Sequence, residues 1–282
     1  MYRFLLFLLA KIFAYLPLKV VHFLGIIIGP VFHALKPSIK KTLIHNLAST
    51  NIFATQSSLD EAVKLNVSET GKTMMESFAI WASPQSRLLK WIVKVNGQEL
   101  IDAALARNKG IIFLTPHLGS YEMTSIYYGS RHPLTILYRR PRKKWLFNFM
   151  VEGRSKGFIK LAETNTTGVK QLFQAIKNGE AIGILPDQIS SKGQGEHANF
   201  FGRPAYTMVL LSKLAMKSEA TIIMAVGERL KDSKGFVIHL QQLDTSDIAT
   251  PEKLNNVLEL QIRNLPLQYL WNYDRYKQQA LN

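Results

Sequence analysis

The sequence contains no cysteine, which excludes disulfide bonds, a thiol nucleophile and a thiolate zinc site. It also lacks acidic residues over its first 59 positions, the first being Asp60. Across 282 residues, 35 Lys and Arg stand against 20 Asp and Glu, a formal net charge of +15. Such an excess favours polyanionic partners: nucleic acid, anionic lipid or an acidic protein.

Motifs of several enzyme classes are missing as well. There is no Gly-x-Ser-x-Gly, which makes a hydrolase nucleophile elbow unsupported. No H-E-x-x-H or other metal-ligand spacing connects the histidines, and neither a Walker A sequence nor a G-x-G-x-x-G after a strand is present. We therefore expect no metal, no cofactor and no nucleotide chemistry, and no motif indicates a nucleic-acid partner.

The N-terminus is strongly apolar and basic. Residues 4–16 are apolar except for Lys11, and residues 20–35 carry no charged side chain. The second run would form a helix of roughly 24 Å, somewhat short of the ~30 Å hydrocarbon core. A spanning helix and two interfacial helices broken at Pro17 are both allowed, a buried hairpin is the alternative, and a cleaved signal peptide fits worse. We expect residues 1–35 to anchor the chain to a membrane, and residues 36–282 to form the folded domain.

Apolar runs that read as strands alternate with helical segments along the rest of the chain, which predicts an α/β fold with a mostly parallel or mixed central sheet flanked by helices. A Gly- and Ser-rich stretch, residues 190–202, reads as a long loop. The expected strands are 91–95, 111–115, 134–138, 158–161, 181–185, 221–226 and 236–241, and the expected helices are 60–81, 99–106, 123–129, 145–151, 168–177, 206–216 and 252–265.

A histidine and a glutamate stand where the strand 111–115 turns into a helix. His117 falls in the turn and Glu122 in the first helical turn, at the carboxyl end of a strand, where α/β proteins usually bind ligands. There the carboxylate can accept one imidazole N–H and leave the other nitrogen as a base. A strand-end histidine bonded to backbone, beside an ordinary first-turn glutamate, is an equally good interpretation of the spacing.

Other polar residues follow neighbouring strands. Asp187 closes the apolar strand 181–185, where it would orient a base, hold an arginine or form an Asx turn. Five of the six residues 139–144 are basic, which suits either a solvated surface or phosphate recognition by arginine. Arg154 lies in a basic, loop-like stretch that assigns it no role.

Taken together, these residues resemble the bacterial lipid A late acyltransferases, within the wider glycerolipid acyltransferase group that shares His-x4-Asp/Glu. The likeness rests on the apolar N-terminus, His117-x4-Glu122, the pair Tyr138-Arg139 and the later Pro-Asp-Gln at residues 186–188. It extends to residues 200–204 and 271–277. Many members have Asn-Trp before the glutamate, where this chain has Ser120-Tyr121, and Ser120 would then act as a helix N-cap.

The resemblance implies transfer of a fatty acyl chain from acyl-carrier protein, or from coenzyme A, to a hydroxyl of a phosphorylated lipid A precursor. The reaction would take place at the cytoplasmic face of the bacterial inner membrane, without a covalent acyl-enzyme. By position, His117 would be the general base with Glu122 as its orienting partner. The residues expected to bind substrate are Gly119, Ser120, Tyr138, Arg139, Arg140, Arg154 and Asp187, with Gly119 and Ser120 amides or Arg154 as oxyanion donors.

Two other functions fit the sequence. A phospholipid acyltransferase acting on a lysophospholipid or glycerol phosphate needs the same His–Glu chemistry and the same basic surface. A non-catalytic, basic membrane-surface protein would explain the charge and the apolar N-terminus, but would leave the corner at His117 and Glu122 as coincidence.

Overall fold

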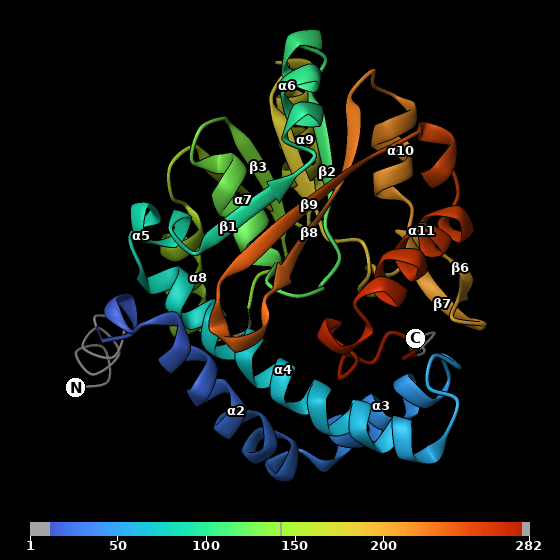
Figure 1. The fold of residues 1–282 in the computed structure, drawn as a ribbon. Helices are drawn as coiled ribbons and strands as arrows, with labels where there is room; N and C mark the ends of the chain where they lie inside the picture. The colour runs from blue at the N-terminus through green and yellow to red at the C-terminus, as the bar shows by residue number, and fades with distance from the viewer. Residues whose placement is uncertain (1–11, 142, 278–282) are drawn as a thin grey trace.

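The central sheet has seven strands, and His117 and Asp187 of the candidate site follow two neighbouring strands of it. The computed structural model describes residues 12–141 and 143–277. The strands are ordered β1-β9-β8-β2-β5-β3-β4, and every neighbouring pair is parallel except β8 and β9 (Figure 1). This confirms the predicted mostly parallel sheet. The strands are β1 (Ile92–Asn96), β2 (Ile111–Leu114), β3 (Leu134–Tyr138), β4 (Ile159–Glu163), β5 (Ala181–Ile184), β8 (Thr221–Arg229) and β9 (Phe236–Leu243).

Helices cover both faces of this sheet, as the alternating pattern predicts. One apolar cluster joins the sheet to α6 (Gln98–Arg107) and α7 (Tyr121–Gly129). A second cluster joins the opposite face to α9 (Thr166–Lys177), α10 (Leu210–Met216) and α11 (Pro251–Asn264). The central strands are buried on both faces, β2 and β5 along their entire length.

Residues 195–208 differ from the prediction. The expected loop 190–202 contains β6 (Gly195–Phe200), which pairs with β7 (Arg203–Met208) in a separate antiparallel hairpin. The expected helix 206–216 is therefore wrong in its first half, and only α10 is helical. Contacts distant in sequence explain the difference: the Asn255 side chain on α11 donates to the carbonyl of Asn199 at 2.8 Å and to the Thr207 hydroxyl at 3.0 Å.

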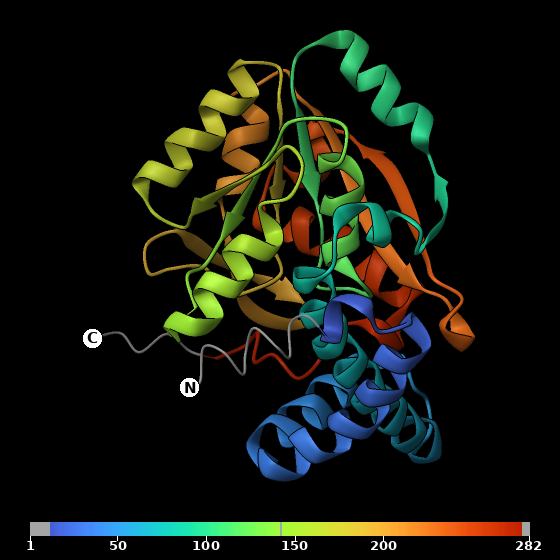
Figure 2. The same cartoon turned by 90° about the vertical axis from the view of Figure 1, so that its left-hand side faces the viewer.

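Three helices form a layer beneath the carboxyl edge of the sheet: α2 (Leu18–Leu35), α3 (Pro37–Ala48) and α4 (Gln56–Ala82) (Figures 1 and 2). Of the helices in the described part of the chain, only α2 is long and apolar enough to cross a membrane, judged by length and composition. It begins after Pro17 and continues through Pro30. Most of the apolar run 4–16 lies outside the described residues. The shorter elements are α5 (Gln85–Leu89), α8 (Lys144–Arg154), and the 3₁₀ turns η1 (Lys231–Ser233), η2 (Thr245–Ile248) and η3 (Pro266–Gln268).

Candidate active site

His117 and Asp187 come together because their strands are neighbours in register. Strand β2 pairs in parallel with β5, and Leu114 lies opposite Ile184. The register continues past the last strand pair, since the Thr115 amide donates to the carbonyl of Ile184 at 3.0 Å. Three positions beyond Leu114 and Ile184 are His117 and Asp187, which therefore meet at the carboxyl edge of the sheet.

Asp187 binds His117 with both carboxylate oxygens. Its Oδ1 lies 2.8 Å from the imidazole Nδ1, and its Oδ2 accepts the backbone N–H of His117 at 2.9 Å. Because a carboxylate only accepts hydrogen bonds, Nδ1 carries a proton, and in the uncharged tautomer this leaves the lone pair on Nε2. Burial alone would raise the pKa of the Asp187 carboxyl, but the charge and hydrogen bonds of His117 lower it.

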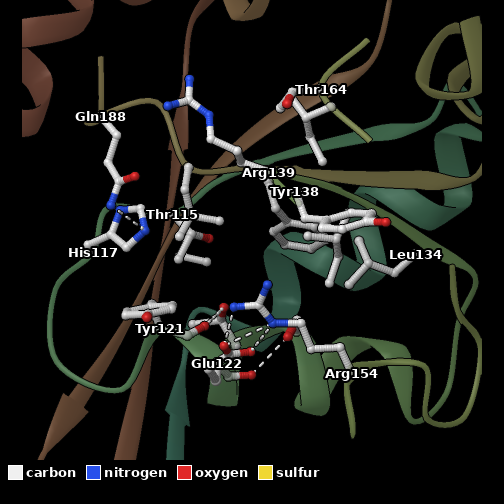
Figure 3. Close-up of a pocket in the computed structure, with 18 of the residues that line it drawn as sticks. Thr115, His117, Tyr121, Glu122, Leu134, Tyr138, Arg139, Arg154, Thr164 and Gln188 are labelled. Atoms are coloured by element: carbon white, nitrogen blue, oxygen red, sulfur yellow. Dashed lines mark hydrogen bonds and ion pairs between the residues drawn. The ribbon is translucent and has the colours of Figure 1, made fainter. Parts of the chain in front are cut away.

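The second imidazole nitrogen faces the cavity described below. The Gln188 side-chain amide lies 3.2 Å from Nε2, and the Tyr121 ring packs against the imidazole with 4.8 Å between ring centroids (Figure 3). The side chain of His117 is 14% exposed and that of Asp187 is 1% exposed. His117 is thus an oriented, partly accessible imidazole held by a carboxylate that water does not reach.

Glu122 does not orient His117, so that expectation is wrong. Its carboxylate accepts hydrogen bonds from Arg154, with Nε 3.0 Å from each oxygen and Nη2 on Oε1, and from the Trp81 indole at 3.3 Å. Figure 3 shows the paired side chains of Glu122 and Arg154 pointing toward each other at the mouth of the cavity. The physical reason is the register that places Asp187, a nearer carboxylate, on Nδ1.

Arg154 is held in place as a fixed positive charge. It is the last residue of α8 rather than part of a loop, which corrects the sequence interpretation. Burial lowers the pKa of its guanidinium, but the charge of Glu122 outweighs that effect and raises it. Its Cζ lies 5.5 Å from the centre of the Trp81 ring, a cation–π contact.

The amides of Gly119 and Ser120 are already used inside the fold. Gly119 N–H donates to the carbonyl of Gln268 at 3.0 Å, and Ser120 N–H donates to that of Gly227 at 2.7 Å. Gly119 adopts φ +60°, and a Cβ there would lie 2.1 Å from the Gly227 oxygen, so only glycine fits. Neither amide is available as an oxyanion donor. Ser120 does occupy the N-cap position of α7, but its side chain makes no capping bond.

A cavity of about 300 Å³ opens beside His117, Glu122 and Arg154. Its mouth is polar, and its interior extends between the sheet and the helices α6 and α7. Apolar side chains from four strands and one helix line that interior. They are Ile101, Phe113, Ile136, Ala225, Ile238 and Leu240.

The basic run 139–144 borders this cavity only in part. Tyr138 and Arg139 line it; the Tyr138 hydroxyl donates to Glu163 at 3.1 Å, and Arg139 Nη2 donates to the carbonyl of Ile189 at 3.1 Å. Arg140 is exposed, with Nη1 3.7 Å from Glu163. Arg142 lies outside the described residues. In the described part of the chain, no three His, Asp or Glu side chains are grouped as around a metal ion.

Three residues of the site were missed from the sequence. Gln188 follows Asp187 directly, and only the strand register shows that its amide reaches the imidazole. Tyr121 precedes Glu122, and its burial, followed by the charge of Glu122, raises the pKa of its hydroxyl to about 12. Trp81 reaches Glu122 from the end of α4, 41 positions away, which no local pattern predicts.

An α/β sheet that presents an oriented histidine beside a cavity with apolar lining is suited to a substrate that carries an apolar chain. Comparison with known proteins is specific. The family model described as bacterial lipid A biosynthesis acyltransferase matches residues 1–278, and the chain belongs to that family. It is therefore an acyltransferase of lipid A biosynthesis.

The sequence identity to individual relatives is low, but for the first two relatives named here the alignment covers most of both chains. The chain is 26% identical to the lipid A biosynthesis palmitoleoyltransferase of Escherichia coli K12 over 273 residues, covering 93% of this chain and 86% of the relative. It is 25% identical to the lauroyltransferase of the same organism over 272 residues, covering 93% and 87%. A phosphatidylinositol mannoside acyltransferase of Mycobacterium tuberculosis is 24% identical over 158 residues, 54% of this chain and 50% of that protein.

Proposed function

We propose that the enzyme transfers a fatty acyl chain from an acyl-carrier-protein thioester to a hydroxyl of a lipid A precursor, at the cytoplasmic face of the inner membrane. The observation that carries this proposal is His117, fixed by Asp187 through Nδ1, with its Nε2 at the mouth of a largely apolar cavity. A fatty acyl chain fits the cavity, and the thioester carbonyl would then lie at the mouth beside the base. The two Escherichia coli relatives are named for palmitoleoyl and lauroyl transfer in lipid A biosynthesis.

His117 acts as general base in a single displacement. Nε2 takes the proton of the acceptor hydroxyl while the hydroxyl oxygen attacks the thioester carbonyl carbon. The tetrahedral intermediate then collapses, the C–S bond breaks, and the imidazolium returns the proton to the leaving thiolate. Asp187 keeps Nδ1 protonated and stabilises the imidazolium. A thioester is already activated, so no covalent acyl-enzyme is needed.

Glu122 acts through Arg154 rather than through His117. With two of its nitrogens on the Glu122 carboxylate, the guanidinium cannot swing into solvent, and it lines the cavity as a fixed cation. A fixed cation beside the reacting carbonyl stabilises negative charge on the oxyanion or on a substrate phosphate. Gln188 supplies an amide donor in the same region once the acceptor hydroxyl displaces it from Nε2.

The acceptor would approach over Arg139 and Arg140, whose guanidinium groups suit the phosphates of a lipid A precursor. Coenzyme A as donor is the alternative to the carrier protein. The acidic carrier protein fits a chain of net charge +15 better.

A second acceptor class has one observation in its favour. Part of the chain is similar to an enzyme named for acylating phosphatidylinositol mannoside, another membrane glycolipid. The same base, cavity and cation would serve a lysophospholipid or a glycerol phosphate. The site residues are therefore compatible with both acceptor classes, and only the acceptor that the enzyme uses distinguishes a lipid A acyltransferase from a phospholipid acyltransferase.

The test is acyl transfer by the purified enzyme from acyl-carrier protein and, separately, acyl-coenzyme A, with a lipid A precursor or a lysophospholipid as acceptor. We expect product only with the lipid A precursor, faster from the carrier protein, and its loss in His117→Ala. His239→Ala is the matched control, because His239 Nε2 lies 2.8 Å from a carboxylate, Glu228, outside the cavity. Transfer only to the lysophospholipid would overturn the acceptor assignment.

A further inference from the structure

Helix α2 turns its more polar side toward the protein and its apolar side outward, the reverse of the usual pattern in a soluble protein. The side that packs on the protein carries its two histidines and two glycines, His22, His33, Gly25 and Gly29, all buried. The side turned away is almost wholly apolar and includes some of the largest exposed hydrophobic side chains of the chain. Those exposed residues are Val20, Phe23, Ile26, Ile27, Val31 and Leu35. An apolar outer face of this size marks an interaction surface.

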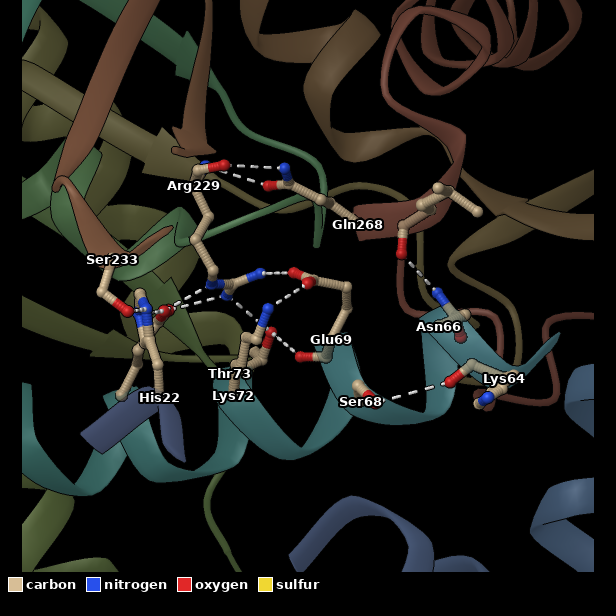
Figure 4. Close-up of polar contacts among 12 residues, drawn as sticks. His22, Lys64, Asn66, Ser68, Glu69, Lys72, Thr73, Arg229, Ser233 and Gln268 are labelled. Carbon is tan, nitrogen blue, oxygen red and sulfur yellow. Dashed lines mark hydrogen bonds and ion pairs between the residues drawn. The ribbon is translucent and has the colours of Figure 1, made fainter. Parts of the chain in front are cut away.

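The inner side of α2 is fixed to α4 along its length. A Cβ on Gly25 would lie 2.5 Å from Lys72 Cα, and one on Gly29 would lie 2.2 Å from the carbonyl oxygen of Val67, so the two backbones touch. His22 Nε2 lies 2.6 Å from Glu76, and its Nδ1 lies 2.8 Å from the Ser233 hydroxyl (Figure 4). As residue numbers rise along α2 they fall along α4, so the helices are antiparallel.

Helix α4 is in turn bound to the body of the enzyme. Glu76 and Glu69 both hold Arg229 on β8, and the Asn66 amide donates to the carbonyls of Leu267 and Tyr269 at 2.8 Å (Figure 4). The N-terminal half of α4 exposes charged side chains. They are Asp60, Glu61 and Lys64.

This packing does not allow α2 to cross a bilayer. If α2 stood perpendicular to the membrane, the antiparallel α4, with its charged residues, would stand at the same depths. The sheet edge attached to α4 would follow it into hydrocarbon, where unpaired polar groups and charges are excluded. With α2 lying along the surface, its apolar face enters the bilayer while α4 and the sheet remain in water.

We infer that α2 is a monotopic membrane-docking surface, which lies in the plane of one leaflet of an anionic bilayer rather than spanning it. Charge on the adjoining segments fits that partner. Residues 12–59 carry no acidic side chain, and exposed lysines flank the apolar face, one before it and three after it; they are Lys19, Lys36, Lys40 and Lys41. Lysines at a membrane surface attract anionic headgroups.

The docked helix also places the membrane beside the active site. Helix α4 contacts α2 through Glu76, and its Trp81 donates to Glu122 at the cavity mouth. A lipid acceptor would thus reach His117 from the leaflet without leaving it. The inference concerns membrane geometry alone, so it stands or falls independently of the proposed reaction.

Depth measurements test it directly, and the absence of native cysteine makes single labels simple. Val20, Ile27 and Ala34 recur every seven residues on the exposed side of α2. Each is replaced by cysteine, labelled with the fluorophore NBD, and bound as full-length protein to phosphatidylethanolamine/phosphatidylglycerol vesicles whose lipids carry nitroxide quenchers at shallow or deep positions. We expect all three labels at the same shallow depth.

A spanning helix gives a different result: adjacent labels would differ in depth by roughly 10 Å, with Ile27 deepest and the other two near opposite surfaces. That pattern would overturn the inference, as would failure of the wild type to bind these vesicles. A second measurement is vesicle affinity of Phe23→Asp, expected to fall at least tenfold. Phe173→Asp is the matched control, since Phe173 is exposed on α9, at the far end of the sheet, and should bind as wild type (Figure 1). Equal affinity of the two variants would contradict the docking surface.

Discussion

Asp187 forms two hydrogen bonds with His117, one to the imidazole Nδ1 and one to the backbone N–H of the same residue. One carboxylate thereby fixes both the position of the turn and the tautomer of the ring. The His–Glu pair suggested by the spacing of residues 117 and 122 is replaced by two separate ion pairs. Each makes its own contribution to the proposed chemistry.

Replacing Asp187 with asparagine should lower the turnover number about 10²- to 10⁴-fold, with little change in KM. The asparagine side chain is close in shape to aspartate, but its amide can donate as well as accept a hydrogen bond. It therefore no longer forces the imidazole Nδ1 to carry the proton. Steady-state kinetics of acyl transfer measure the effect. Glu228→Gln, which alters the His239 pair outside the cavity, is the control and should retain wild-type rates. A wild-type rate in Asp187→Asn would remove Asp187 from the mechanism.

Glu122→Gln and Arg154→Gln should each reduce acyl transfer strongly, and the double variant should be about as slow as the slower single one. The reason is that Glu122 acts by holding Arg154, so once one partner is lost the other contributes little. A double-mutant cycle on kcat/KM gives the coupling. Glu219→Gln, which breaks an exposed ion pair with Lys109, is the control and should have no effect. Additive losses would mean that Glu122 has a role independent of Arg154.

Narrowing the apolar cavity should shorten the acyl chain that the enzyme prefers. Gly183 on β5 lines the cavity, and the nearest atom to a Cβ built there is Ile136 Cγ1 at 3.5 Å, so a small side chain fits. Gly183→Val should shift the preferred donor to a shorter chain, and Leu240→Ala should shift it to a longer one. Competition between acyl donors of different length, read by mass spectrometry, measures both. An unchanged preference in both variants would place the acyl chain elsewhere.

The buried pair of Glu76 and Arg229 should make stability fall in acid. Burial raises the pKa of Glu76, but Arg229 outweighs it and lowers the pKa from 4.5 to about 2. A carboxyl with a lowered pKa stabilises the fold above its unfolded pKa, and this is lost as pH falls from 4.5 toward 2. The difference corresponds to on the order of 3 kcal/mol.

Urea denaturation at pH 6, 4 and 3 measures this loss. Glu76→Gln should be less stable at pH 6 by about 3–5 kcal/mol, because Arg229 stays buried without its partner, and should lose less stability in acid. The same pH slope in variant and wild type would assign the acid sensitivity to other groups.

Sequence reasoning recovered the sheet because the apolar runs of its central strands are short, buried on both faces and separated by helical segments. It failed at residues 195–208, where the hairpin depends on Asn255 and other residues distant in sequence. It placed His117 and Asp187 at one sheet edge, but could not give the register that joins them. The partner of Glu122 was missed because Arg154 and Trp81 are contributed by α8 and α4, whose packing no local spacing encodes.

The most direct measurement is mass spectrometry of lipid A from cells that lack the gene and are complemented with wild type, His117→Ala or His239→Ala. We expect lipid A missing one acyl chain in the deletion strain, restored by wild type and by His239→Ala but not by His117→Ala at equal protein levels. Restoration by His117→Ala would contradict the assignment of His117 as the base.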